Sequence, residues 1–167
     1  MLFTMKENDV KEKIAPAKRS EKTIALNKKA YYEYEILNKY DAGIALSGTE
    51  IKSLRGMKGS IQEAYARIKN RELWLVNSNI PEYKFGSLNN HVPVRDRKLL
   101  LHRTEIKKIE NKLKDKGLTL IPLKLFFSGP FLKVEIGIAK GKKLYDKRES
   151  VKKADVQRQL KRVKNSF

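Results

Sequence analysis

Apolar and polar side chains alternate along several segments between residues 23 and 139. Such a period of two is typical of a half-buried strand, because successive side chains point to opposite faces of a sheet. Tyr32, Tyr34 and Ile36 alternate in this way with charged or polar neighbours. The alternation is strictest in the last predicted strand, where the apolar residues are Leu132, Val134, Ile136 and Ile138.

Turn residues divide the remaining apolar runs. One run, residues 42–46, begins directly after Asp41, and residues 81–97 are expected to form an irregular loop. Pro122 lies inside a predicted strand and indicates an edge or a bulge, because proline lacks the N–H that a central strand donates. Four of the runs form two predicted hairpins. In the first, residues 63–68 and 72–76 are the strands and residues 69–71 the turn; in the second, residues 118–127 and 131–139 are the strands and residues 128–130 the turn.

Two helices are predicted between the strands. Ser47 or Thr49 is placed to cap the first, a short helix that runs through Ile51. The second covers residues 106–113, where apolar residues recur at helical spacing and form one stripe among lysines. Gly117 is placed to end it. The pattern therefore predicts a mainly β fold, with an antiparallel sheet closed or nearly closed into a small barrel.

The two ends of the chain differ from the middle. Residues 1–22 are polar and charged, and we expect a flexible arm. Residues 23–139 hold the apolar runs and form the predicted domain. Residues 140–167 carry eight lysines and three arginines against three acids, and they contain too few apolar residues for a core. The chain is thus predicted to be one domain with two tails.

The net charge narrows the choice of partner. The chain carries 38 Lys and Arg against 19 Asp and Glu, a formal net charge of +19. Such an excess attracts polyanions, of which nucleic acid and anionic membrane are the large cellular examples. No apolar run is long enough to span a bilayer, and Trp74, the single tryptophan, lies in a strand-like run rather than on an amphipathic helix. Nucleic acid is therefore the favoured partner, and the absence of cysteine suits a reducing cytoplasm.

Few residues are arranged for catalysis. His91 and His102 are the only histidines, and neither has a carboxylate spaced to orient it. Asp41 lacks a second acid with which to form a general acid–base pair. No phosphate-binding loop or metal-binding motif is present. We therefore expect neither an enzyme nor a bound cofactor or metal ion.

Basic residues instead come in blocks, some beside aromatic or apolar side chains. An unpaired base can stack on a ring while its phosphate meets an ammonium group, so this pairing favours RNA. A generic solvated surface explains Lys28 and Lys29 equally well, and core packing explains Tyr32 and Tyr34 better. The blocks are Lys28–Lys29 before Tyr31–Tyr32; Arg95, Arg97 and Lys98 before three leucines; and Lys140, Lys142 and Lys143 before Lys147 and Arg148.

The tail contains a further helical pattern. Val156, Leu160, Val163 and Phe167 form a narrow apolar stripe among many like charges. A helix with so many like charges is marginal in water, and phosphates would neutralise its repulsion. We therefore expect residues 140–167 to be disordered alone and helical on RNA, which circular dichroism of the tail with and without RNA would test.

Several motifs resemble the SmpB family, the bacterial partners of transfer-messenger RNA (tmRNA, also called SsrA RNA). They occur in order over most of the chain: residues 24–30 (IALNKKA), 42–55 (AGIALSGTEIKSLR), 65–67 (YAR), 97–102 (RKLLLH), 116–125 (KGLTLIPLKL) and 139–148 (AKGKKLYDKR).

The resemblance implies an oligonucleotide-binding-type β-barrel with two or three flanking helices. It also implies binding to the tRNA-like domain of tmRNA, support for its alanylation, and delivery to stalled ribosomes for trans-translation. The expected partners are tmRNA and the ribosome, with EF-Tu and alanyl-tRNA synthetase engaged indirectly through tmRNA. We expect a cytoplasmic monomer whose tail probes the decoding centre and the empty mRNA channel.

The resemblance also assigns residues. The RNA-facing positions of the family match Asn27, Asp41 and Leu100, and the neighbouring Lys28, Lys29 and Lys98 are expected to assist them. The family usually has Glu where Asp41 stands, and many members have Arg-His where this chain has Tyr31-Tyr32. The expected ribosome-contacting residues are Lys140, Gly141, Lys142, Lys143, Asp146, Lys147 and Arg148.

Two other classes of function share some of these features. A structural ribosomal protein would have the same charge, barrel and tail, but would sediment in equal amounts with ribosomal subunits. An RNA-processing enzyme on a similar barrel would need further acids near the RNA, and it would cleave labelled RNA in the presence of Mg²⁺.

Overall fold

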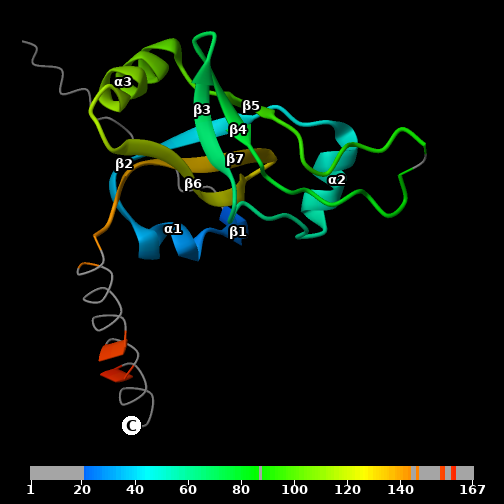
Figure 1. The fold of residues 1–167 in the computed structure, drawn as a ribbon. Helices are drawn as coiled ribbons and strands as arrows, with labels where there is room; N and C mark the ends of the chain where they lie inside the picture. The colour runs from blue at the N-terminus through cyan, green and yellow to red at the C-terminus, as the bar shows by residue number, and fades with distance from the viewer. Residues whose placement is uncertain (1–20, 87, 144–145, 147–154, 157–158, 161–167) are drawn as a thin grey trace, which may run out of the picture.

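The computed structural model describes residues 21–86, 88–143, 146, 155–156 and 159–160 of the 167-residue chain. Within these residues it contains seven strands and three helices (Figure 1). The strands are β1 (Glu21–Leu26), β2 (Tyr34–Ile44), β3 (Tyr65–Lys69), β4 (Glu72–Val76), β5 (Arg97–Leu100), β6 (Leu118–Ser128) and β7 (Phe131–Gly141). The helices are α1 (Lys28–Glu33), α2 (Gly48–Arg55) and α3 (Arg103–Leu113).

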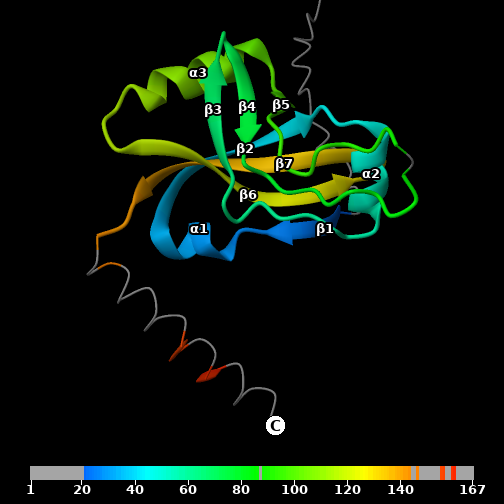
Figure 2. The same ribbon diagram turned by 45° about the vertical axis from the view of Figure 1, so that its right-hand side comes forward.

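All strand pairs are antiparallel, in the order β1-β6-β3-β4-β5-β2-β7. Because β7 also pairs with β6 along ten residue pairs, six of the strands form a closed hydrogen-bonded ring. β1 lies outside this ring, on the free edge of β6. Two orientations of the ribbon show the long strands β2, β6 and β7 crossing the molecule between α1 and α3 (Figures 1 and 2). The mainly β, antiparallel class predicted from the sequence is confirmed.

The interior of this ring holds the main hydrophobic core. In β7 the alternation predicted from the sequence is observed, because Val134, Ile136 and Ile138 are fully buried. In β4 Leu73 and Leu75 are likewise buried and contribute to the core. Burying a leucine or isoleucine side chain stabilises the fold by about 1.5–3 kcal/mol, so this inward face holds the sheet closed.

Both predicted hairpins are present. Asn70 and Arg71 connect β3 to β4 with φ of 53° and 60°, the left-handed geometry of the turns that match strand twist. Gly129, with φ of 61°, precedes Pro130 in the turn between β6 and β7. The register of β6 against β7 shifts between Pro122 and Lys124. Pro122 therefore marks a bulge in a strand that is paired on both sides, which is one of the two alternatives predicted.

The first predicted strand is partly wrong. Residues 28–33 form helix α1, so Tyr32 is helical, and the strand begins at Tyr34 and continues without a break through Asp41 to Ile44. The physical reason is a local cap: the Asn27 side chain accepts a hydrogen bond from the backbone N–H of Ala30 at 3.0 Å. The period-two pattern at Tyr32 was accidental.

The other two helices follow their predicted signals. Ser47 and Glu50 form a reciprocal capping box at the start of α2, as the sequence indicates. In α3 the apolar stripe faces the sheet and Ile109 is fully buried. The helix ends at Leu113 with Lys114 as its C-cap, so Gly117 does not end it as predicted. Gly117 adopts φ of 89°, a conformation that glycine tolerates best, in the turn before β6.

Each of the two predicted tails includes residues that belong to strands of the folded domain. β1 begins at Glu21, within the predicted arm, and β7 continues through Lys140 and Gly141, within the predicted tail. The rest of the predicted arm, residues 1–20, and most of the tail lie outside the described residues, and so does the predicted tail helix as a whole. No helix in the described part of the chain is long and apolar enough to cross a membrane.

Candidate RNA-binding surface

Three of the predicted RNA-binding residues lie on one outer face of the closed sheet. Ala42, Leu99 and Val134 point into the core, so their neighbours along β2, β5 and β7 point outward. Gly43 pairs with Leu100 on one side and with Lys133 on the other, which brings the three strands side by side. We call this face the outer patch: Asp41, Gly43, Lys98, Leu100, Lys133 and Glu135.

A cavity of about 710 Å³ opens beside the outer patch. Asp41, Lys98 and Leu100, three of the residues predicted to bind RNA, all line this cavity. The start of α3 and the β3–β4 turn close the other sides and add Arg71, His102 and Arg103. The cavity therefore combines cations for phosphate with carboxylates and apolar side chains, the groups with which proteins read single-stranded RNA.

Asp41 is the unusual carboxylate of this surface. Burial raises its pKa, and Glu135, directly opposite in the neighbouring strand, raises it further by repulsion. Glu135 is itself ion-paired with Lys39 at 2.8 Å. Like charges placed opposite each other in a sheet are destabilising. Asp41 is thus held at an energetic cost, in a position where its oxygens line the cavity.

Leu100 and Lys98, both on β5, have different surroundings. The Leu100 side chain is 51% exposed although its strand neighbour Leu99 is buried. A Cβ atom added to Gly43 would lie 3.3 Å from Leu100 Cβ, so glycine at this position leaves room beside the leucine. Lys98 forms an ion pair with Glu72, and both side chains are 40% exposed. An exposed pair of this kind is weak, so a phosphate can displace the carboxylate.

The remaining predicted residues lie at the opposite end of the domain. α1, which carries Lys28 and Lys29, and α3, which borders the cavity, lie on opposite sides of the sheet in both orientations (Figures 1 and 2). Lys28 is exposed, and Lys29 is exposed and paired with Glu63 at 3.1 Å. The hydrogen bond that Lys29 donates to the Glu63 carboxylate raises the pKa of Lys29. The structure therefore separates the predicted RNA-binding residues into two groups.

Asn27 contributes differently from its predicted role. Its side chain is 1% exposed, and its two amide hydrogens are donated to the carbonyl oxygens of Ile61 at 3.2 Å and Pro122 at 3.1 Å. Its Oδ1 caps α1. Both donors of the amide are therefore in use, and the residue positions the helix that carries Lys28 and Lys29 instead of offering a free amide to RNA.

The start of the tail is attached to the same helix. Lys142 donates its backbone N–H to Glu33 O at 2.9 Å and its Nζ to Tyr31 O at 3.1 Å. Lys39 Nζ lies 5.3 Å from the Tyr31 ring centroid and bonds its hydroxyl at 3.2 Å. The predicted tail residues Lys140, Gly141, Lys143 and Asp146 are described, with Lys143 N donating to Asp146 Oδ2 at 3.3 Å, whereas Lys147 and Arg148 lie outside the described residues.

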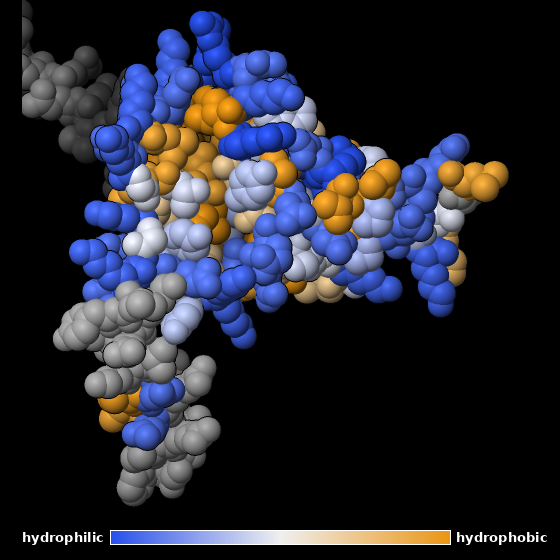
Figure 3. All heavy atoms as spheres, in the orientation of Figure 1, coloured by the Kyte–Doolittle hydropathy of each residue, from blue (hydrophilic) through white to orange (hydrophobic). Residues whose placement is uncertain are grey.

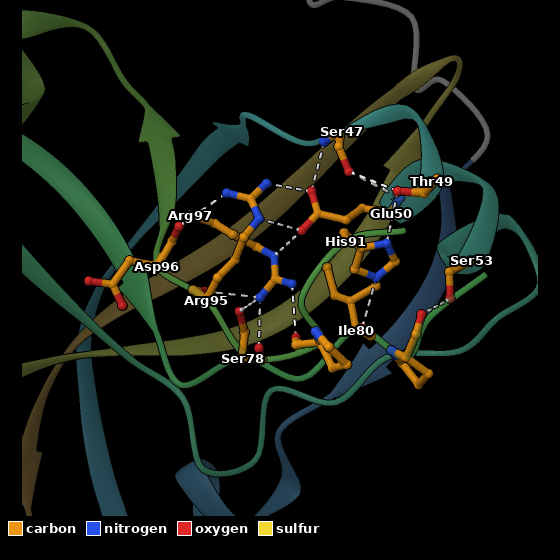
Figure 4. Close-up of polar contacts among 12 residues, drawn as sticks. Ser47, Thr49, Glu50, Ser53, Ser78, Ile80, His91, Arg95, Asp96 and Arg97 are labelled. Carbon is orange, nitrogen blue, oxygen red and sulfur yellow. Dashed lines mark hydrogen bonds and ion pairs between the residues drawn. The ribbon is translucent and has the colours of Figure 1, made fainter. Parts of the chain in front are cut away.

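Arg95 and Arg97 do not form the exposed basic block that the sequence suggests (Figure 4). Arg97 is fully buried, and its Nε donates to Glu50 Oε1 at 2.9 Å. Arg95 Nε donates to the same oxygen at 2.8 Å from the other side. The Nη1 group of Arg97 donates further bonds to Ser78 O at 2.7 Å and Ser78 Oγ at 2.8 Å. We call Glu50, Ser78, Arg95 and Arg97 the buried network.

The buried network fixes the protonation state of its acid. Burial alone would raise the pKa of Glu50, but the hydrogen bonds from Arg95 and the Ser47 backbone, together with the charge of Arg97, outweigh it and lower that pKa. Nearby, His91 bonds Thr49 Oγ1 at 2.9 Å and Ile80 O at 3.0 Å (Figure 4). These contacts tie α2 to the long loop before β5, and so they hold Lys98 and Leu100 in place.

Two residues of the cavity were not predicted from the sequence. Arg71 occupies the hairpin turn and Arg103 begins α3, and the fold brings both against β5. Their isolated positions in the sequence gave no block of charge to detect. In the described part of the chain, no three His, Cys, Asp or Glu side chains are grouped so that they could hold a metal ion.

The space-filling view shows how hydrophilic and hydrophobic side chains are distributed on one face of the molecule (Figure 3). Hydrophilic side chains cover most of the visible face, with hydrophobic side chains between them (Figure 3). A separate hydrophobic group lies at the tip of the loop between β4 and β5, which projects past α2 (Figures 1 and 3). In that loop Phe85 is 79% exposed. The surface is therefore polar and cationic with local apolar openings.

Fold and surface together define a small antiparallel β protein with a cation-lined surface cavity. Comparison with known proteins gives the family: the family model described as SmpB protein matches residues 24–166. The chain belongs to the SmpB family.

Curated relatives agree with this assignment. The chain is 53% identical over 143 residues to the SsrA-binding protein of Carboxydothermus hydrogenoformans, covering 86% of this chain and 96% of the relative. It is 54% identical over 140 residues to that of Thermosipho melanesiensis, covering 83% and 95%. A solved structure described as "tmRNA-SmpB: a journey to the center of the bacterial ribosome" superposes with a TM-score of 0.61 at 45% identity, covering 81% of this chain and 95% of that one.

Proposed function

We propose that this chain binds the tRNA-like domain of tmRNA and delivers it to stalled ribosomes for trans-translation. The observation that carries the proposal is the convergence of Asp41, Lys98 and Leu100 on one cavity. Relatives that are about half identical are named SsrA-binding proteins, and a related structure is described as a tmRNA–SmpB complex at the ribosome, which supports the same partners. The closed ring of six strands then serves as the oligonucleotide-binding-type barrel.

The division of the cationic residues suggests two tasks. The cavity beside the outer patch binds the tRNA-like domain, whereas Lys28, Lys29 and the start of the tail at Lys140–Lys143 form the second cationic end, which faces the ribosome. Residues 140–167 then probe the decoding centre and the empty mRNA channel. The protein acts without catalysis of its own, as a monomer in the cytoplasm, and it reaches EF-Tu and alanyl-tRNA synthetase through the alanylated tmRNA.

Affinity purification followed by sequencing of the bound RNA tests this function. Tagged full-length protein from bacterial cells should enrich tmRNA over elongator tRNAs and ribosomal RNA, and adding it to a charging reaction should increase alanylation of tmRNA. A structural ribosomal protein would instead recover ribosomal RNA in stoichiometric amounts, and that result would contradict the proposal.

A deletion variant can separate binding of the free RNA from rescue of stalled ribosomes. Deleting residues 140–167 should leave affinity for the free tRNA-like domain within about threefold of the intact protein, because the cavity residues precede the deletion. The same deletion should abolish tagging of peptides on stalled ribosomes in a reconstituted translation reaction. Loss of affinity for the free RNA as well would place the tail within the RNA site.

A further inference from the structure

A second opening, an apolar groove of about 350 Å³, lies next to the cavity. The two share Leu100, which lines both. The groove runs from this leucine across Gly43 to the turn between β6 and β7, where Phe131 begins β7. Leu46 and Ile51 contribute to its walls. The groove is therefore a continuation of the cavity along the outer face of the sheet.

Phe131 is an exposed aromatic residue at the edge of this groove. Its ring is 60% exposed at the edge of the groove, whereas Val134 and Ile136, further along the same strand, are fully buried. Phe131, Lys133 and Glu135 share one face of β7 because side chains in a strand alternate. Lys133 also lines the groove. An exposed aromatic ring with a cation two residues away is the arrangement on which unpaired bases stack.

Gly43 keeps the groove open. It faces outward between its partners Leu100 and Lys133 in the sheet. Any side chain at position 43 would begin 3.3 Å from Leu100 Cβ, and it would fill the space between Leu100 and Phe131. The groove thus depends on a residue without a side chain, at the point where it joins the cavity.

We propose that this groove holds one unpaired base of the bound RNA, stacked on Phe131 and packed against Leu100, while Lys133 contacts its phosphate. The proposal rests on the proposed function and extends it by a second subsite. Continuity with the cation-lined cavity supports it, because a strand that leaves the cavity over Leu100 enters the groove directly. A protein partner fits less well, since stable protein interfaces need about 800 Å² from each side and the groove offers two rings and a few aliphatic side chains.

Binding measurements with variants at position 131 test the subsite. The probe is the tRNA-like domain of tmRNA with a terminal fluorophore, and the readout is fluorescence anisotropy. Loss of one stacked base costs about 1–3 kcal/mol, so Phe131→Ala should weaken binding about tenfold. Phe131→Trp should bind at least as tightly as the wild type, and Phe131→Leu should be at least fivefold weaker. Phe85→Ala, which removes a still more exposed ring outside both openings, should bind within twofold of the wild type.

The outcomes separate this inference from the proposed function. If wild-type protein binds the RNA and Lys98→Ala weakens it, but Phe131→Ala binds within twofold of wild type, then the subsite is refuted and the function stands. Equal affinity of Phe131→Leu and wild type would also refute stacking and indicate a purely aliphatic contact. If the wild type binds the tRNA-like domain no better than an unrelated RNA hairpin, the proposed function itself fails.

A spectroscopic readout tests stacking directly. Trp74 is the only tryptophan of the chain, so Trp74→Phe combined with Phe131→Trp places a single fluorophore at the groove. Stacking of a base on this indole should quench its emission in proportion to RNA bound. Emission that is unchanged at saturating RNA would overturn the proposal.

Discussion

The buried network and the outer patch use the same chemical groups for opposite purposes. In the buried network Glu50 is fully enclosed and accepts hydrogen bonds from two arginines, which lower its pKa. In the outer patch Asp41 faces Glu135 across the sheet, and its pKa is raised. Paired charges in the first region fix the long loop before β5. In the second region two carboxylates face each other, although Glu135 is paired with Lys39, and the Lys98–Glu72 pair is exposed enough for a ligand to displace it. Charges that are enclosed and paired stabilise the fold, whereas exposed charges that repel each other mark the surface at which we expect the ligand to bind.

The largest expected effect breaks the buried network. Glu50→Gln should lower the free energy of unfolding by about 3–5 kcal/mol, because it leaves the buried guanidinium of Arg97 without its counter-charge. Urea denaturation measures the change. Glu72→Gln is the matched control, since this acid pairs with Lys98 at the exposed surface and its loss should cost at most about 1 kcal/mol. Equal losses in the two variants would show that burial does not distinguish the regions.

Asn27→Ala is expected to have the next largest effect. The substitution removes the cap of α1 and leaves the carbonyl groups of Ile61 and Pro122 without their donor, so stability should fall by about 2–3 kcal/mol in thermal or chemical unfolding. Asn111→Ala, at an exposed asparagine of α3, should change stability by less than about 0.5 kcal/mol. If Asn27→Ala keeps full stability but loses RNA affinity, the asparagine contacts RNA directly and its structural role is refuted.

Leu100→Ala should weaken RNA binding while leaving the stability of the fold nearly unchanged. Because the side chain is half exposed, stability should stay within about 1 kcal/mol of wild type. Affinity for the tRNA-like domain should fall about tenfold, or about 1.4 kcal/mol, because the leucine lines both openings. Anisotropy titration and thermal unfolding of the same preparation measure both quantities. A variant that unfolds more easily but binds normally would remove Leu100 from the binding surface.

The smallest expected effect concerns Asp41. The pKa of Asp41 is higher in the folded state than in the unfolded state, so ionised Asp41 destabilises the fold at pH values above its folded-state pKa. At pH values below the unfolded-state pKa the carboxyl group is protonated in both states and no longer affects stability. Asp41→Asn should therefore raise the melting temperature at pH 7 by roughly 1–3 °C. The gain should disappear as the pH falls below about 4, where the wild-type carboxyl is protonated.

The same substitution should weaken RNA binding at pH 7 several-fold, since it replaces one of the two acceptor oxygens of the carboxylate by an NH₂ donor and removes the charge. A melting temperature lower than that of the wild type at pH 7 would contradict the charge mismatch. Unaltered RNA affinity would mean that Asp41 does not touch the ligand.

Local sequence signals predicted most of the sheet but not the identity of every surface residue. The hairpins, the capping box of α2 and the apolar stripe of α3 depend on neighbours within a few residues, so they could be predicted. Helix α1 is only six residues long and is held by Asn27 through carbonyl groups 34 and 95 positions away, which no local pattern contains. The strand β1 likewise acquires its partner only when β6 is in place.

The site shows the same limit. The resemblance to the SmpB family selected Asp41 and Leu100, and the basic block before the leucines selected Lys98. The structure brings these three residues together. The resemblance could not show that Arg97, one residue before Lys98, is buried. The acid that pairs with Arg97 is Glu50, which lies 47 positions away in the sequence. Nor could spacing reveal Phe131 beside Leu100, because the two residues meet only after β5, β2 and β7 have paired.

Backbone amide chemical shifts during titration with the tRNA-like domain of tmRNA test the central claim most directly. The account predicts that the largest shift changes occur along residues 41–43, 98–106 and 131–135. Amides of the buried network at Glu50 and Ser78 should change little. Changes confined to α1 and the loop between β4 and β5, with an unaffected outer patch, would contradict the assignment of the RNA-binding surface.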